Sequence, residues 1–447
     1  MRSSLIVFLF LMCCRLDLAW AQTDAPAKTT VLDGRLESGA SYRIEVPDKW
    51  SGRVLLYSRG YSSSHQGPVR VTAGKERDQL LAQGYALVAA SYSRPGWALE
   101  EAVPDQLAVL DVFASRIGQP KQVIAWGSSM GGLITVALLE QHGQRFHGGM
   151  ALCASSSGTL GMMNTALDGA WVFANVTGAG ATLPVRLTQT GTEDQQQRTA
   201  WREAIDAAQA NPLGRARIAL AASLSQTPVW AAGQARPQPG DVHAVQAGWK
   251  ANFLAGILLP RDNQERRAGG NFSWNTQVRY GELLRQSGHM EIVRQLYAQA
   301  GHSLDSDLAA LEQAPRISAD PAAVAYMFKH YVPTGRIDHP VLLMQTVSDP
   351  LTLTEFTEDY ATTVQSQGRQ PLVQTAYVER VGHCNFTADE VLAGLKALQS
   401  RIAQGQWEAS AAALNATSGG QTFVTHKPQA LLRSCSRSPR GCEGVRP

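Results

Sequence analysis

Hydrophobic positions along the first third of the chain alternate between two rhythms. Short runs of apolar and β-branched residues are separated by stretches whose apolar residues recur at helical spacing. Strands that alternate with helices in this way predict a mostly parallel sheet covered by helices on both faces. The runs that predict strands are residues 30–32, 41–46, 53–57, 86–92, 123–126 and 149–153.

This rhythm stops near residue 154. Residues 155–338 contain almost no strand-like run, whereas amphipathic patterns predict helices at residues 195–210, 241–258, 276–286, 290–300 and 322–329. Asp320 and Pro321 have the N-cap and first-turn character expected for the last of these helices. The strand–helix alternation returns at residues 340–347, 354–366, 372–378 and 387–403. We therefore expect one α/β core with a helical insertion; a separately functioning middle domain is the alternative.

The two ends of the chain differ from this core in composition. Arg2, an apolar stretch at residues 5–14 and the small residues before Ala21 are typical of an export signal that is cut after Ala21. Ten apolar residues are too few to span about 30 Å of hydrocarbon, so we expect a periplasmic or secreted protein without stable membrane insertion. The small, polar and basic end predicts a peripheral extension. The expected order is signal peptide 1–21, core 22–154, insertion 155–338, core 339–407 and extension 408–447.

Charge and cysteine usage narrow the functional class. The formal net charge of the 447 residues is +3, which does not predict a nucleic-acid-binding surface. Four cysteines lie beyond the signal, and an even number in an oxidising compartment favours disulfides, with three pairings open. Cys435 and Cys442 could close a small loop, which would leave Cys153 with Cys384. No motif with the spacing of metal ligands occurs, and we expect neither a metal nor a cofactor.

The sequence Gly127-Ser128-Ser129-Met130-Gly131 separates a predicted strand from a predicted helix. A serine on such a sharp turn takes strained backbone angles, and flanking glycines relieve the crowding. We therefore predict Ser129 as a nucleophile, with Gly127 and Gly131 as the glycines of its turn. An ordinary glycine-rich turn is the alternative.

A serine nucleophile requires a histidine base and an acid that orients it. Asp349 follows the predicted strand at residues 340–347, and His383 follows the later strand after Gly382. We predict these two as the acid and the base; a loop aspartate and a surface histidine are the alternative. Asp359 and Glu379 are less favoured acids, since one lies inside a predicted helix and the other lies too near the histidine in sequence.

Acyl transfer also needs N–H donors for the developing oxyanion. One expected donor is the N–H of Met130, the residue after the nucleophile. The other is the N–H of Tyr61, in the loop Ser58-Arg59-Gly60-Tyr61 that follows an early strand. A tight turn that only requires Gly60 is the alternative.

On these residues the chain resembles the α/β-hydrolase superfamily of serine hydrolases, over residues 22–154 and 339–407. The resemblance implies an eight-stranded sheet, acyl-enzyme chemistry and an insertion that covers the site as a cap. One departure is Arg59-Gly60-Tyr61, which replaces the His-Gly-Gly sequence of many esterases.

The ending Gly382-His383-Cys384 is also similar to tannase and feruloyl-esterase relatives, in which a cysteine beside the serine bonds a cysteine beside the histidine. Ser128 occupies the position beside the nucleophile here, so that bridge cannot form in the same way. The resemblance implies Cys153 as a substitute partner for Cys384.

We expect an exported serine hydrolase that cleaves carboxylic esters of small-molecule or polymeric substrates. An amidase or peptidase with the same triad is the first alternative, and a non-catalytic binding protein on the same fold is the less favoured second. Half of the ten tryptophans lie in the insertion. They either line a cleft for an apolar acyl group or form the core of the insertion: Trp171, Trp201, Trp230, Trp249 and Trp274.

Overall fold

The computed structural model describes residues 28–64, 68–180, 183, 185, 192–259 and 261–435. The predicted signal peptide and Cys442 lie outside the described residues. Within the described part of the chain, no helix combines the length and the apolar character needed to cross a membrane.

The fold is built on one sheet with the strand order β1-β2-β4-β3-β5-β6-β7-β8-β9. All eight predicted strands form, and the mostly parallel α/β class is confirmed. Among the strands of the described residues, antiparallel pairing is confined to β1–β2, β2–β4 and β8–β9. The short β9 is an addition to the prediction. The strands are β1 (Thr29–Arg35), β2 (Ser41–Pro47), β3 (Arg53–Ser58), β4 (Tyr85–Ala90), β5 (Gln122–Ser128), β6 (Gly148–Leu152), β7 (Val341–Ser348), β8 (Val373–Val381) and β9 (Phe423–Val424).

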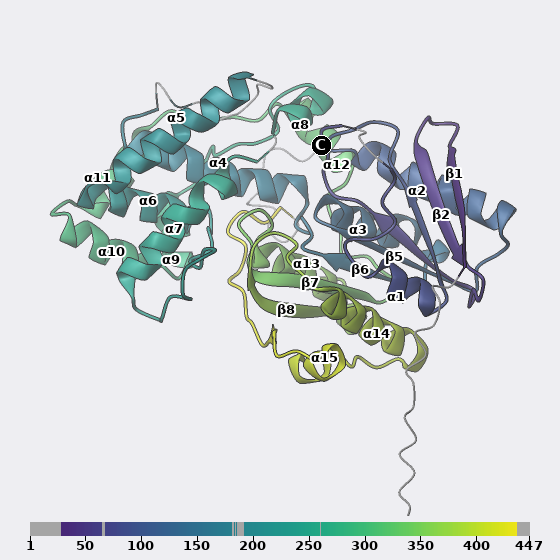
Figure 1. Cartoon of the computed structure of the whole chain (residues 1–447). Helices are drawn as coiled ribbons and strands as arrows, with labels where there is room; N and C mark the ends of the chain where they lie inside the picture. The colour runs from purple at the N-terminus through teal and green to yellow at the C-terminus, as the bar shows by residue number, and fades with distance from the viewer. Residues whose placement is uncertain are drawn as a thin grey trace, which may run out of the picture.

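Helices cover both faces of this sheet because its strands are apolar on both faces (Figure 1). Along β5, Val123 and Ala125 belong to the hydrophobic cluster under α2 (Leu99–Arg116), α3 (Met130–His142) and α13 (Thr354–Ser366). The alternate residues Ile124 and Trp126 belong to the cluster under α1 (Arg77–Ala82) and α14 (Ala388–Gln404). This period of two is the side-chain alternation of a strand, and it places the carboxyl ends of the parallel strands along one edge.

Nine helices of the described chain lie between β6 and β7. Seven of them form a lobe beside the sheet, whereas the other two, α8 and α12, pack against the main core (Figure 1). The Asp320 side chain accepts a hydrogen bond from Ala322 N (2.9 Å), which confirms the predicted cap of α12. The helices are α4 (Gly158–Val176), α5 (Thr192–Gln209), α6 (Pro212–Leu224), α7 (Val242–Ile257), α8 (Arg261–Ala268), α9 (Tyr280–Gln286), α10 (Met290–Gln299), α11 (Leu304–Gln313) and α12 (Pro321–Lys329).

The helical lobe has a hydrophobic core of its own. Trp171, Trp201 and Trp249 are buried in it, and Trp171 stacks on Tyr280 with ring centroids 5.2 Å apart. Trp274 is buried in the main core instead, and Trp230 is partly buried. Of the two interpretations of the tryptophans, the structure favours packing over an aromatic cleft.

The extension after residue 407 is not peripheral in its described part, 408–435. It forms α15 (Ala411–Ser418) and β9, and its last residues reach the helical lobe. There Arg433, a residue of the predicted basic tail, is buried and donates to Asp168 Oδ2 (2.6 Å) and to the Trp274 carbonyl (2.8 Å). A buried charge of this kind requires a partner, so Arg433 belongs to an internal ion pair and not to a solvated surface.

Candidate active site

Ser129 lies between β5 and α3 in a strained conformation, with φ 60° and ψ −124°. A non-glycine residue in such a region costs about 1–3 kcal/mol and is held there by its surroundings. Its N–H donates to the Leu152 carbonyl (2.9 Å). A Cβ atom on Gly131 would collide with the Ser58 carbonyl, and one on Gly127 would collide with the Gly131 carbonyl. The two predicted glycines are therefore required by close backbone approach.

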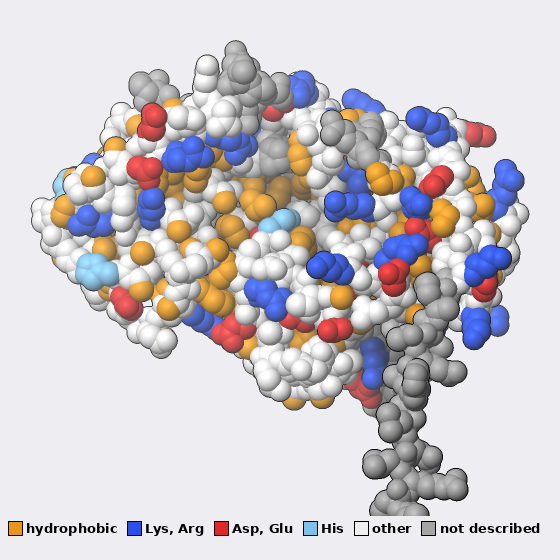
Figure 2. Space-filling model, viewed as in Figure 1, with side chains coloured by type: hydrophobic (Ala, Val, Ile, Leu, Met, Phe, Trp, Pro, Cys, Tyr) orange, Lys and Arg blue, Asp and Glu red, His pale blue; other side chains and the backbone are white. Residues whose placement is uncertain are grey.

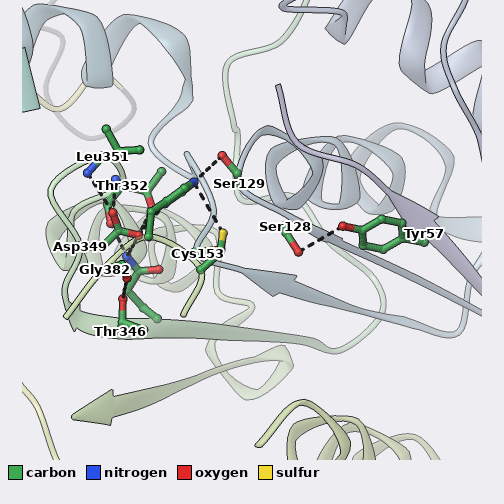
Figure 3. The surroundings of a disulfide bond; sticks show 12 residues. Tyr57, Ser128, Ser129, Cys153, Thr346, Asp349, Leu351, Thr352 and Gly382 are labelled. Carbon is green, nitrogen blue, oxygen red and sulfur yellow. Dashed lines mark hydrogen bonds and ion pairs between the residues drawn. A yellow bond between two sulfur atoms is a disulfide. The ribbon is translucent and has the colours of Figure 1, made fainter. Parts of the chain in front are cut away.

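The structure brings Ser129, His383 and Asp349 together from three separate loops (Figure 3). His383 Nε2 lies 2.9 Å from Ser129 Oγ, and His383 Nδ1 lies 2.7 Å from Asp349 Oδ2. With Asp349 as a carboxylate, Nδ1 carries the proton, which leaves Nε2 free to accept the serine proton. Of the less favoured acids, Asp359 lies within α13 and Glu379 pairs with Arg236.

Asp349 is fixed by the turn that follows it. Its Oδ1 accepts hydrogen bonds from Leu351 N (2.9 Å) and Thr352 N (3.1 Å), and its Oδ2 accepts one from Thr352 Oγ1 (2.7 Å). The carboxylate is fully buried, whereas the His383 side chain is 23% exposed. Thr352 was not among the predicted residues, although an aspartate followed by threonine three positions later is a recognisable turn signal.

The loop that carries His383 (the histidine loop) is fixed by the residues on both sides of the histidine, Gly382 and Cys384. Gly382, with φ 107°, donates its N–H to the Ser348 carbonyl (2.8 Å) and accepts a hydrogen bond from Thr346 Oγ1 (2.8 Å). A disulfide joins Cys384 to Cys153 at the end of β6, with their Cα atoms 5.2 Å apart.

The disulfide also bears on metal binding. Both sulfurs and the His383 imidazole lie within 4.8 Å of one another. Sulfurs bonded to each other are not thiolates and do not ligate a metal, so this cluster is not a metal centre in the oxidised protein. Of the other two cysteines, Cys435 is buried.

The loop after β3 passes directly beside the nucleophile. A Cβ atom on Gly60 would lie 3.2 Å from Ser129 Cβ and 3.2 Å from the Ser128 carbonyl oxygen. On the other side of the serine, Met130 is the first residue of α3, where backbone N–H groups have no partner within the helix. The peptide groups of both predicted oxyanion donors, Met130 and Tyr61, thus border Ser129; their role as donors stays a prediction.

Arg59 anchors this loop to the end of β4. Its guanidinium lies over the Tyr92 ring (4.7 Å to the centroid) and donates to the Ser91 carbonyl (2.7 Å). The Tyr92 hydroxyl in turn donates to the Arg59 carbonyl (3.1 Å). Burial lowers the pKa of Arg59 and raises the pKa of Tyr92. Arg59 therefore occupies the position of the histidine in the esterase pattern, and its role here is to anchor the loop.

Replacing Gly60 by alanine should lower kcat for a neutral ester about 10- to 100-fold, because the new methyl group displaces the loop from Ser129. Steady-state kinetics with p-nitrophenyl acetate measure this effect. Gly281→Ala, in α9, where the new Cβ would meet only Leu308 Cδ1 at 3.9 Å, is the matched control and should leave kcat unchanged. Full activity in Gly60→Ala would show that this loop does not position an oxyanion donor.

Ser129 and His383 open into a cavity of about 480 Å³. Met162, Leu258 and Leu259, from the helical insertion, form part of its wall, and none of the five insertion tryptophans lines it in the described chain. Figure 2 shows hydrophobic side chains gathered along the boundary between the helical lobe and the part of the protein that contains the sheet. The size and the apolar walls of the cavity suit an acyl group as large as an aromatic ring.

Tyr57 forms the far side of this cavity. Its hydroxyl donates to Ser128 Oγ (3.5 Å), and burial raises the pKa of Tyr57, so that it remains a neutral donor (Figure 3).

Several known proteins resemble this chain in sequence or in fold. Residues 98–182 match the model of the prolyl oligopeptidase family. The chain is 29% identical over 411 residues to an o-phthalyl amidase of Xanthobacter agilis, covering 84% of this chain and 87% of that protein. A Pyrococcus furiosus esterase structure aligns with 87% of this chain and 94% of its own at 11% identity and a TM-score of 0.41. A puromycin hydrolase structure aligns with 89% of this chain and 42% of its own, at 11% identity and a TM-score of 0.36.

The fold and the sequence matches define this protein as an enzyme of the serine hydrolase class. Its mostly parallel sheet with helices on both faces has the α/β-hydrolase architecture, and the chain is similar in sequence to the proteins named above. The likeness to tannase and feruloyl-esterase relatives stays a resemblance carried by Gly382-His383-Cys384 alone.

Proposed function

We propose that this protein is an exported hydrolase that cleaves carboxylic esters through an acyl-enzyme on Ser129. The observation that carries the proposal is the continuous line of contacts from Ser129 Oγ, which lines the cavity, through the His383 imidazole to the buried Asp349. A nucleophile, a base and an orienting acid in this arrangement are the minimum requirement for acyl transfer at a serine hydroxyl.

In the proposed reaction, His383 Nε2 accepts the hydroxyl proton as Ser129 Oγ attacks the ester carbonyl. The N–H groups of Met130 and Tyr61 stabilise the oxyanion, and Asp349 stabilises the imidazolium. His383 then protonates the leaving alcohol, and a water molecule activated by the same imidazole releases the acid. Asp349 stays ionised throughout.

Amide cleavage is a second candidate activity, and one finding favours it: the relative of similar length is named an o-phthalyl amidase. The same triad cleaves amides when His383 protonates the departing amine. A monoamide of o-phthalic acid is one substrate of this kind, and it keeps a free carboxylate beside the scissile carbonyl.

A matched pair of substrates separates the two activities. We expect kcat/KM for a p-nitrophenyl ester to exceed that for the p-nitroanilide of the same acyl group by more than about 100-fold. Equal or faster turnover of the anilide would make the protein an amidase. In both cases the product is read as absorbance, and an uncatalysed blank corrects for the more labile ester.

Export is part of the proposal and has two supports. Residues 1–21 have the composition of a cleavable signal. The disulfide between Cys153 and Cys384 is of the kind that persists in oxidising compartments such as the periplasm.

A further inference from the structure

The active-site cavity has an uneven distribution of charge. Among the described residues that line it, Arg70 is the only arginine or lysine and Glu76 the only aspartate or glutamate. Both belong to the segment between β3 and α1, whereas Met162, Leu258 and Leu259 of the helical insertion supply apolar wall to the same cavity.

The two charges differ in what they can offer to a ligand. Glu76 is 1% exposed, and its Oε1 accepts a hydrogen bond from Gly74 N (2.8 Å), so this carboxylate organises its own loop. Arg70 is exposed, and no carboxylate of the described residues lies within ion-pair distance of it. A ligand that enters the cavity therefore meets an uncommitted guanidinium.

Arg70 lines the same cavity as the nucleophile Ser129. Tyr57, whose hydroxyl lies 3.5 Å from Ser128 Oγ, lines that cavity as well. A guanidinium presents paired N–H donors that match the two oxygens of a carboxylate. In this position it would meet a carboxylate on the acyl half of a substrate whose scissile carbonyl lies at Ser129.

We propose that Arg70 is a specificity-determining residue that binds a free carboxylate on the acyl group. The preferred substrates are then half-esters or half-amides of dicarboxylic acids, whose carbon skeleton lies against the apolar wall. This inference rests on the proposed hydrolase function and names its substrate class.

The test compares two esters of similar shape, one anionic and one neutral. Monomethyl phthalate carries a carboxylate, and methyl 2-methylbenzoate carries a methyl group in its place. We expect wild-type kcat/KM to favour monomethyl phthalate. The ratio of the two kcat/KM values should fall about tenfold or more in Arg70→Ala, fall further in Arg70→Glu and be partly restored in Arg70→Lys. It should also decrease between about 0.05 and about 0.5 M salt, because salt screens an exposed ion pair.

Lys75→Ala is the matched control, since Lys75 is an exposed cation of the same loop that does not line the cavity. It should keep the wild-type ratio. An unchanged ratio in Arg70→Ala, with both esters still cleaved, would overturn the role of Arg70 and leave the hydrolase intact. A wild-type preference for methyl 3-(aminomethyl)benzoate that is lost in Glu76→Gln would assign recognition to Glu76 and would also overturn the proposal. A folded wild-type protein that cleaves neither these esters nor p-nitrophenyl acetate would instead refute the proposed function.

Discussion

Replacing Ser129 by alanine should lower kcat/KM for p-nitrophenyl acetate by about 10⁴-fold or more. The change removes one hydroxyl, the atom that His383 Nε2 contacts at 2.9 Å, and leaves the backbone of the turn as it is. The melting temperature should therefore stay within about 2 °C of wild type, which for a chain of this size corresponds to at most about 2 kcal/mol. Steady-state kinetics and thermal unfolding followed by circular dichroism measure the two quantities.

The second half of this experiment tests whether the effects of the variants at Ser129 and His383 on kcat/KM add up. His383→Ala should cause a loss similar to that of Ser129→Ala, and the double variant should lose no more than either single variant, because nucleophile and base act as a unit. Activity in Ser129→Ala at the wild-type level would show that another residue attacks the ester.

Removing the disulfide between Cys153 and Cys384 should lower both the stability and the activity of the protein. In the variant Cys153→Ser/Cys384→Ser, we expect the free energy of unfolding to fall by about 2–5 kcal/mol, because the bond closes a long loop and so restricts the unfolded chain. The cysteines are 231 positions apart. Activity should fall as well, since Cys384 directly follows His383 and the bond ties the histidine loop to the end of β6. Chemical denaturation and kcat measurements quantify both losses.

Dithiothreitol provides the control for the disulfide. It should bring the activity of the wild type down to that of the double variant, and the same treatment of the double variant measures the contribution of the disulfide at Cys435. A double variant with wild-type stability and kcat would show that Gly382 and its hydrogen bonds to Ser348 and Thr346 hold the histidine loop without the sulfur bridge.

The sheet was predictable because its strands are short apolar runs bounded by turns, a local signal. The two-residue strand β9 was not, since Phe423 and Val424 carry no such pattern and are ordered by pairing with β8 and by hydrogen bonds between Phe423 and Asn415. Helix α4 was missed for another reason: every residue in it except Asn175 is buried, so that it has no polar face and no helical period to read. The buried pair of Arg433 and Asp168 joins residues 265 positions apart, a distance at which composition gives no information.

The order and the positions of Ser129, Asp349 and His383 could be read from the sequence, because each directly follows a parallel strand and such strand ends meet at one edge of a sheet. The anchors of these residues could not be read in this way. Thr352 acts through contacts at 2.7 Å and 3.2 Å with Asp349 and His383, and Arg59 acts by stacking on Tyr92. Both depend on how separate loops approach one another in space.

Covalent labelling by a fluorophosphonate, followed by peptide mass spectrometry, tests the central claim most directly, since this reagent captures only a serine activated by a neighbouring base. We predict one label per molecule, on Ser129, in the folded wild-type protein, and strongly reduced labelling in His383→Ala. A label on a different residue, or no label on a protein that circular dichroism shows to be folded, would contradict the assignment of Ser129 as the nucleophile.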